Sequence, residues 1–171
     1  TDQIPILDLS DFLSGKPGAL EATAAELRHA CEEVGFYFIR GHGVPWNVVD
    51  AAFEASRRFH ALPLDEKMKL KANEHNTGYM ASKTSISGAS KVYDGPRKNN
   101  LVAAYSLKRD LAADHPDVLA KKRFRATNPW PGNLPGFREA CLAAMNALDE
   151  LATSLLPLYA LALDLPADFF A

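Results

Sequence analysis

The chain has 171 residues, of which 47% are apolar and 23% charged, a balance typical of one folded globular domain. Its formal net charge is −2 and its basic residues are scattered, which argues against electrostatic binding of nucleic acid. No apolar run reaches the ~18 residues of a membrane span, and the polar start at residues 1–3 is not a secretory signal. We therefore expect a cytoplasmic chain without a membrane or nucleic-acid partner.

The first third of the chain is predicted to form a strand, a helix and a second strand. An apolar run with β-branched residues predicts a strand over 4–9, with Pro5 near its start or at a sheet edge. Apolar residues then recur at helical spacing, which predicts an amphipathic helix over 19–34. Gly35 stands where a left-handed residue would end that helix. The aromatic and β-branched run that follows predicts a strand over 36–40.

The middle of the chain is predicted to hold two helices and two short strands. One apolar face predicts a helix over 46–60, and an acidic first turn favours a second helix over 65–71. Short strands are predicted over 78–81 and 101–107. The segment 81–100 between them is polar and rich in Ser, Gly and Asn, which is typical of a mobile or substrate-facing loop.

The last third is dominated by one long predicted helix. Apolar residues keep a spacing of three to four over 136–163. Together, the elements favour an α-rich α+β fold. Cys31 and Cys141 both lie in helical apolar patterns, so we expect two buried free thiols in a reducing compartment.

The five histidines do not assemble into a recognisable metal site. A mononuclear non-haem iron site uses two His and one carboxylate, and an H-x-D step on a strand aims two of these ligands the same way. Only His115-Pro116-Asp117 has that spelling, and no histidine follows it. We interpret it as a loop or the start of a short helix, for which capping by Asp114 or Asp117 is a sufficient explanation. No catalytic residue and no metal ligand is assigned in this chain.

His42 is predicted to have a structural role in a turn. It lies between Gly41 and Gly43, directly after the apolar strand predicted over 36–40. A lone histidine in such a turn usually anchors the loop by hydrogen bonds through its ring nitrogens. We therefore prefer this role to metal ligation.

Seven blocks, in order along the chain, resemble the N-terminal region of the isopenicillin N synthase-like, 2-oxoglutarate-dependent dioxygenases. They are I-P-I-L-D-L-S at 4–10, A-C-E-E-V-G at 30–35, the block 35–45, F-H-A-L-P-L-D-E-K-M-K at 59–69, Gly78-Tyr79, N-P-W-P at 128–131 and L-A-L-D-L-P-A-D-F-F at 161–170. The match covers nearly all of the chain. Members of the family commonly carry an acidic residue in the strand that matches 101–107, where this chain has Ala103 and Ala104. The substrate is therefore not carried over.

The resemblance implies a helix-rich N-terminal part of a double-stranded β-helix, or jelly-roll, oxygenase. The family's barrel supplies an H-x-D…H iron triad and an R-x-S step for 2-oxoglutarate, and neither occurs here. We therefore expect most of the barrel core to be missing from the chain and to follow residue 171. Fe(II) and 2-oxoglutarate are implied for the intact enzyme, and neither is expected to bind residues 1–171 alone. By resemblance, Tyr79 and Tyr105, with the loop 81–100, contribute to the substrate pocket; ordinary core aromatics are the alternative.

The predicted function is that of the N-terminal portion of an Fe(II)/2-oxoglutarate-dependent oxygenase that oxidises a small organic molecule with O2. The 171 residues alone are expected to be inactive. The apolar end, with Phe169 and Phe170 and nothing after them to cover them, favours a missing C-terminal half as the partner. Two alternatives stay open: an oxidase of the same family that uses no 2-oxoglutarate, and a non-catalytic half-domain that binds a partner or complements a separate C-terminal chain.

Overall fold

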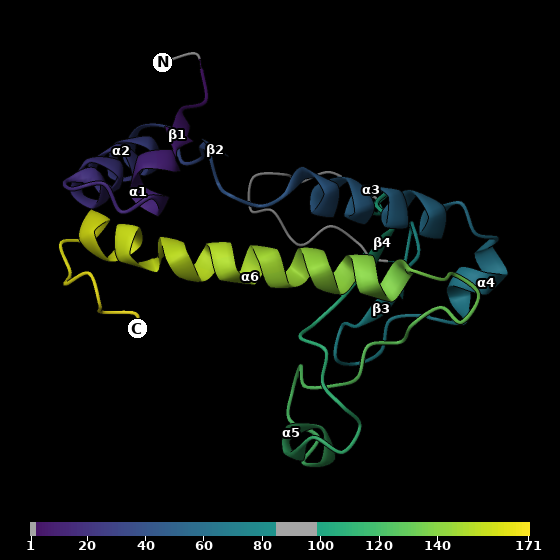
Figure 1. The fold of residues 1–171 in the computed structure, drawn as a ribbon. Coiled ribbons are helices and arrows are strands. Elements are labelled where there is room, and N and C mark those ends of the chain that lie inside the picture. The colour runs from purple at the N-terminus through teal and green to yellow at the C-terminus, as the bar shows by residue number, and fades with distance from the viewer. Residues whose placement is uncertain (1–2, 85–98) are drawn as a thin grey trace, which may run out of the picture. The chain divides into compact units, whose positions relative to one another are not determined.

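The chain divides into two compact units in a computed structural model that describes residues 3–84 and 99–171. Unit 1 comprises residues 1–52 and 143–171, and unit 2 comprises residues 53–142. Figure 1 shows two long helices, α3 (Trp46–His60) and α6 (Phe137–Ala162). Each of them contributes residues to both units. Each unit has a core of its own.

Unit 1 is built on two parallel strands joined through helices. Its elements are β1 (Ile6–Asp8), α1 (Ser10–Leu13), α2 (Ala19–Glu33) and β2 (Phe38–Arg40). Ile6 lies opposite Phe38 in the parallel pair. Parallel strands need a long crossover connection, and α1 and α2 provide it here. The ladder continues past both strands, because the Phe38 amide donates to the Pro5 carbonyl and the Leu9 amide to the Arg40 carbonyl.

The core of unit 1 is aliphatic. One side of the strand pair packs with α2 and the C-terminal part of α6, and its buried members are Leu7, Leu9, Ala24, Leu27, Ala30 and Leu158. Arg28 joins these two helices through its guanidinium group. Its Nε donates to the Ala162 carbonyl at 2.6 Å, and the group pairs with Asp164 at 2.6 Å. A cation here satisfies carbonyl groups left unpaired at the helix end and complements the helix dipole.

The turn after β2 requires a glycine at position 41. Gly41 has a φ of +63°, a left-handed conformation that residues with a Cβ adopt at a cost. A Cβ there would also collide with the Ser10 hydroxyl and approach Asp8 Oδ1 to 2.9 Å. The backbone of this turn therefore lies directly against the start of α1. This contact sets the position of the next residue, His42.

Unit 2 contains a short antiparallel pair and an aromatic core. Its elements are α4 (Leu64–Met68), β3 (Gly78–Met80), β4 (Ala104–Ser106) and α5 (Pro116–Leu119), with parts of α3 and α6. Tyr79 lies opposite Tyr105 across the strand pair. Phe59 is 1% exposed, and its ring centroid lies 4.5 Å from that of Tyr105 and 5.2 Å from that of Phe137.

Several elements are shorter than the sequence predicted. The strands expected over 4–9, 36–40, 78–81 and 101–107 each span three residues. In the last of them, the Val102 amide donates to Asn100 Oδ1 and is not available to a strand partner. The helix expected over 65–71 spans Leu64–Met68, because the Leu70 carbonyl accepts from the Tyr79 amide and pairs with β3. Most of the loop 81–100 lies outside the described residues.

The long helices lie where the sequence placed them. They are α2 at Ala19–Glu33, α3 at Trp46–His60 and α6 at Phe137–Ala162, against predicted ranges of 19–34, 46–60 and 136–163. The prediction of a buried Cys31 was wrong: its side chain is exposed, because it follows Ala30 on α2 and points away from the core stripe. Cys141 is half-buried. Within the described ranges, no helix combines the length and apolar character needed to cross a membrane.

Candidate functional site

The described residues do not fit a metal centre. Over 3–84 and 99–171, no three His, Cys, Asp or Glu side chains lie close enough together to hold a metal ion. A non-haem iron site of the facial type needs two His and one carboxylate converging on one point. These side chains therefore do not form a cradle for Fe(II), and no reaction step is assigned to them.

The H-x-D step at His115 is a helix start. His115 is the N-cap of α5, and its Nδ1 accepts a hydrogen bond from the Asp117 amide at 3.1 Å. The prediction that an aspartate caps this helix was wrong, since the histidine ring takes that place. The Asp117 carboxylate instead pairs with Lys122 at 2.6 Å, and the hydrogen bond from Lys122 lowers the pKa of Asp117. Both side chains thus serve the local turn.

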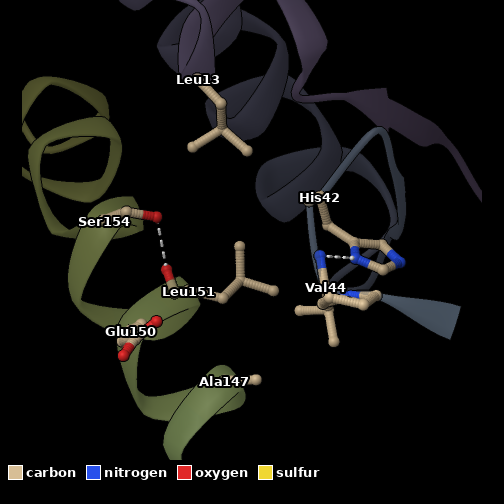
Figure 2. A pocket seen from close by; sticks show the side chains of 9 residues that line it. Leu13, His42, Val44, Ala147, Glu150, Leu151 and Ser154 are labelled. Atoms are coloured by element: carbon tan, nitrogen blue, oxygen red, sulfur yellow. Dashed lines mark hydrogen bonds between the residues drawn. The ribbon is translucent and has the colours of Figure 1, made fainter. Parts of the chain in front are cut away.

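His42 is held by a hydrogen bond within its own turn. The Val44 amide donates to His42 Nδ1 at 3.1 Å (Figure 2). In the neutral ring the proton therefore sits on Nε2. The ring also meets Trp46 edge-on, with the ring centroids 6.2 Å apart. The predicted structural role of His42 stays a prediction, and this hydrogen bond is the kind of contact on which it depends.

A cavity of about 240 Å³ lies in unit 1 between this turn and α6. Leu13 of α1 and Leu151 of α6 point into it (Figure 2). Ser154 contributes little polarity, because its hydroxyl donates to the Leu151 carbonyl at 2.7 Å. The lining residues are Leu13, His42, Gly43, Val44, Pro45, Ala147, Glu150, Leu151 and Ser154. The cavity therefore offers an apolar wall with Glu150 and His42 at its margin.

A second cavity, of about 390 Å³, lies in unit 2 beside β3 and β4. Its lining is largely neutral and combines small apolar side chains with amide groups. The lining residues are Met68, Lys71, Ala72, Asn73, Asn76, Tyr79, Met80, Ala81, Thr84, Asn100, Val102 and Ala104. Asn73 Oδ1 orders the loop before β3 by accepting from Thr77 Oγ1 at 2.9 Å and from the His75 amide at 3.0 Å. We call this space the β3–β4 cavity.

The two tyrosines predicted by resemblance take different places around the β3–β4 cavity. Tyr79 lines it, although its side chain is 4% exposed and packs on Phe59 with the ring centroids 5.8 Å apart. Tyr105 is not among the lining residues, and its hydroxyl donates to the Pro129 carbonyl. Burial, with Cys141 and Asp110 nearby, raises the pKa of Tyr105. The pocket role of both tyrosines stays a prediction.

Sequence reasoning missed a polar network that begins in the N-P-W-P block. Asn128 is 6% exposed, and its side chain pairs with both backbone groups of Lys108: Oδ1 accepts from the amide at 3.0 Å and Nδ2 donates to the carbonyl at 2.9 Å. Nδ2 also donates to Asp110 Oδ1 at 3.0 Å. Asp110 in turn pairs with Arg138 at 2.7 Å. The signal available in the sequence for this network was an asparagine directly before a proline in an apolar block.

This network sets the charge state of Asp110. Burial by itself raises the pKa of this carboxyl, but hydrogen bonds from Arg138 and Asn128 outweigh it and lower the pKa below its usual value. The Arg138 guanidinium also lies 5.8 Å from the centroid of the Trp130 ring. Trp130 meets Phe137 in turn, with the ring centroids 6.1 Å apart. The block thus links the segment after β4 to the start of α6 within unit 2.

The comparisons with known proteins point to one family. The family described as "non-haem dioxygenase in morphine synthesis N-terminal" matches residues 4–133. A 2-oxoglutarate-Fe(II) type oxidoreductase, hxnY, of Emericella nidulans is 32% identical over 97% of this chain and 47% of its own length. A 2-oxoglutarate-Fe(II) type oxidoreductase of Aspergillus fumigatus is 34% identical over 97% of this chain and 49% of its own length.

Solved structures share the fold over the whole chain. A putative 2OG-Fe(II) oxygenase family protein from Caulobacter crescentus superposes with a TM-score of 0.77 at 24% identity, over 99% of this chain and 52% of its own. A full-length protein of Neurospora crassa, solved in complex with alpha-KG, gives a TM-score of 0.76 at 24% identity, over 98% of this chain and 49% of its own. The chain thus spans about half the length of the relatives it matches.

Proposed function

The chain belongs to the family of non-haem dioxygenase N-terminal regions, and on this ground we propose that it is the N-terminal part of an Fe(II)/2-oxoglutarate-dependent oxygenase. The observation that carries the proposal is the family match over residues 4–133, together with relatives of about double length that are named for this chemistry. The intact enzyme oxidises a small organic molecule with O2. Its iron and 2-oxoglutarate bind a jelly-roll barrel that follows residue 171.

Unit 2 is proposed to form part of the wall of the substrate pocket. The β3–β4 cavity supports this role, because ligand sites are concave and mostly apolar with a few placed polar groups. Tyr79 is the aromatic residue of its lining. Tyr105 is proposed to support the cavity wall from the core side. Its hydroxyl donates a hydrogen bond to the Pro129 carbonyl, and its ring packs on Phe59. The substrate itself is not assigned.

The partners proposed for the chain are a small-molecule substrate and the C-terminal half of the same protein. The near-neutral charge supports the absence of a nucleic-acid partner. The free cysteines, one exposed and one half-buried, support a cytoplasmic location, where thiols are kept reduced.

Anaerobic titration of the intact protein with Fe(II) and 2-oxoglutarate tests the proposal. We expect the weak visible charge-transfer band of the ternary complex, and succinate formation once O2 is admitted. Substitution of the barrel histidine in the H-x-D step by alanine is the matched control and abolishes both signals. Residues 1–171 alone are expected to give no band, since the described residues hold no iron site.

Three results would overturn the proposal, and two of them identify an alternative. Iron-dependent O2 consumption without a requirement for 2-oxoglutarate would identify an oxidase of the same family. A reading frame that stops after Ala171 would favour the half-domain that complements a separate chain. Intact protein that gives neither band nor O2 consumption would refute the oxygenase assignment altogether.

A further inference from the structure

A cavity of about 260 Å³ lies in unit 1 between α2 and the segment that joins β1 to α1. On the helix side it is lined by Ala19, Ala22, Thr23 and Glu26. These residues stand at positions i, i+3, i+4 and i+7, so they share one face of α2. The two alanines have short side chains, which leaves room on this face. We call this space the β1–α2 cavity, and the proposed oxygenase function gives it no role.

The charged groups around the β1–α2 cavity are all acidic. Asp8, at the end of β1, and Asp11, in the first turn of α1, line the side opposite the helix. Glu26 adds a third carboxylate from α2. None of the described residues that line the cavity is a Lys, Arg or His. The cavity therefore favours a cation over an anion.

Two of these three carboxylates are already neutralised at the rim. Asp8 Oδ2 accepts from Arg40 Nε at 2.8 Å, and Asp11 Oδ2 lies 2.6 Å from Lys16 Nζ. Glu26 has no ion pair within the described part of the chain. The β1–α2 cavity thus keeps one negative charge that no side chain compensates.

The hydroxyl of Thr23 is an independent indication of a ligand. Thr23 is 6% exposed, and its hydroxyl makes no hydrogen bond to any described residue. Every fully enclosed side-chain N or O atom in residues 3–84 and 99–171 does have such a partner. The Thr23 hydroxyl is therefore not fully enclosed, and the cavity is the space that this nearly buried residue lines. A hydroxyl in this position can both donate to and accept from a polar group inside the cavity.

The spacing of the acidic groups distinguishes an organic cation from a metal ion. In the described ranges, no three His, Cys, Asp or Glu side chains converge closely enough to hold a metal. A cation that fits must therefore distribute its donors over a wider space, and the volume of about 260 Å³ provides it. Ammonium and guanidinium groups carry several N–H donors and no acceptor, which matches a lining of carboxylate and hydroxyl oxygens.

We propose that the β1–α2 cavity binds a small organic cation with an ammonium or guanidinium group, held by the Glu26 carboxylate and the Thr23 hydroxyl. These two residues are three positions apart on α2, so both reach the same ligand. The methyl groups of Ala19 and Ala22 contact its carbon atoms. The inference does not rest on the oxygenase assignment, because every residue it uses belongs to unit 1.

Ligand-observed NMR with methylguanidinium tests the proposal on the intact protein. Methylurea is the matched probe, since it has a similar shape and similar N–H donors but no charge. We expect saturation transfer to the methyl signal of methylguanidinium, and at least about tenfold weaker binding of methylurea. Equal binding of the two probes would overturn the proposal. Absence of transfer to methylguanidinium would also overturn it, because the cavity would then be closed or filled by the protein itself.

Two variants assign the binding to this cavity. Glu26→Gln keeps the shape of an exposed side chain without its charge, and Thr23→Val keeps the volume of a buried one without its hydroxyl. We expect the Kd for methylguanidinium to rise at least about tenfold in Glu26→Gln and about threefold to tenfold in Thr23→Val.

Glu33→Gln is the matched control, since it removes an exposed charge from the end of the same helix. It should change the Kd by less than about twofold. An unchanged Kd in Glu26→Gln, or an equal rise in Glu33→Gln, would show that the cation binds elsewhere and would refute the site.

Thermal unfolding of Thr23→Val without the probe checks the premise about the hydroxyl. Because the hydroxyl has no partner in the described part of the chain, its removal should leave Tm unchanged or raise it. A lower Tm would mean that the protein itself bonds the hydroxyl, which would contradict the proposal.

Discussion

The two units bury their strands in different ways. In unit 1 the parallel strands carry large apolar residues on both faces, and α2 and α6 cover only one of them. In unit 2 the antiparallel pair turns Tyr79 and Tyr105 toward one aromatic core. The opposite face of that pair carries Gly78, Met80, Ala104 and Ser106, which are mostly small, and borders a cavity. The described part of unit 2 thus packs both strand tyrosines into its own core, while that of unit 1 leaves Ile6 and Phe38 about 60% exposed.

The polar contacts of the two units also differ in how deeply they are buried. Arg28 in unit 1 is half-buried, and its contacts at the end of α6 include the exposed carboxylate of Asp164. Asn128 in unit 2 is buried and pairs with the backbone of a neighbouring segment. When a buried hydrogen bond is lost, the polar groups left behind cannot bond to water instead. Single polar substitutions should therefore lower the stability of unit 2 more than that of unit 1.

The largest expected effect is the loss of the aromatic centre of unit 2. Phe59→Ala should lower the free energy of unfolding of the intact protein by about 3–5 kcal/mol, because a buried ring is removed and the cavity only partly closes. Phe53→Ala, on the same helix at 74% exposure, is the matched control and should cost less than about 0.5 kcal/mol. Similar costs for both variants, measured by urea unfolding, would contradict a core centred on Phe59.

Alanine substitutions at Gly41 and Gly43, in the turn of unit 1, separate the cost of a steric collision from the cost of backbone strain. Gly41→Ala should cost about 1–3 kcal/mol, because a left-handed conformation and a collision with Ser10 act together. Gly43 also has a positive φ, of +75°, but has open space around it. Gly43→Ala should therefore cost less, and thermal unfolding of the two variants measures the difference. Equal losses would mean that the contact with α1 is unimportant.

Asn128→Ala tests the buried polar contact of unit 2. Removing the side chain leaves the amide and carbonyl of Lys108 without their partner, at a cost of about 1–3 kcal/mol in unfolding free energy. Asn133→Ala is the matched control, since Asn133 is exposed and its contact with Glu66 is long at 3.4 Å. If both variants unfold at the same urea concentration, the network of Asn128 does not stabilise unit 2.

The smallest expected effect concerns pH. The pKa of Asp110 is lowered in the folded protein, so its contribution to stability is present above its unfolded pKa, about 3.9, and is lost as pH falls through the folded pKa. Asp110→Asn should therefore flatten the dependence of unfolding free energy on pH below about 4, by less than about 1 kcal/mol in total. Asp114→Asn, on an exposed side chain, is the control. An unchanged acid slope would contradict the lowered pKa.

The sequence by itself determined the three long helices and the family. Apolar spacing is a local property, so the helix at 46–60 and its neighbours at 19–34 and 136–163 were predictable. The same holds for Gly35, which takes a φ of +90° at the end of α2. The ordered blocks from 4–10 onward were enough to place the chain among the non-haem dioxygenase N-terminal regions.

Only the tertiary structure decided which residues meet. The end of α4 depends on pairing of Leu70 with Tyr79. The contact of Asn128 with Lys108 joins segments 20 residues apart. Such pairings are set by partners distant in sequence, and no local spacing encodes them. The open side of the β1–β2 pair became visible for the same reason, since burial is a property of packed layers and not of a single strand.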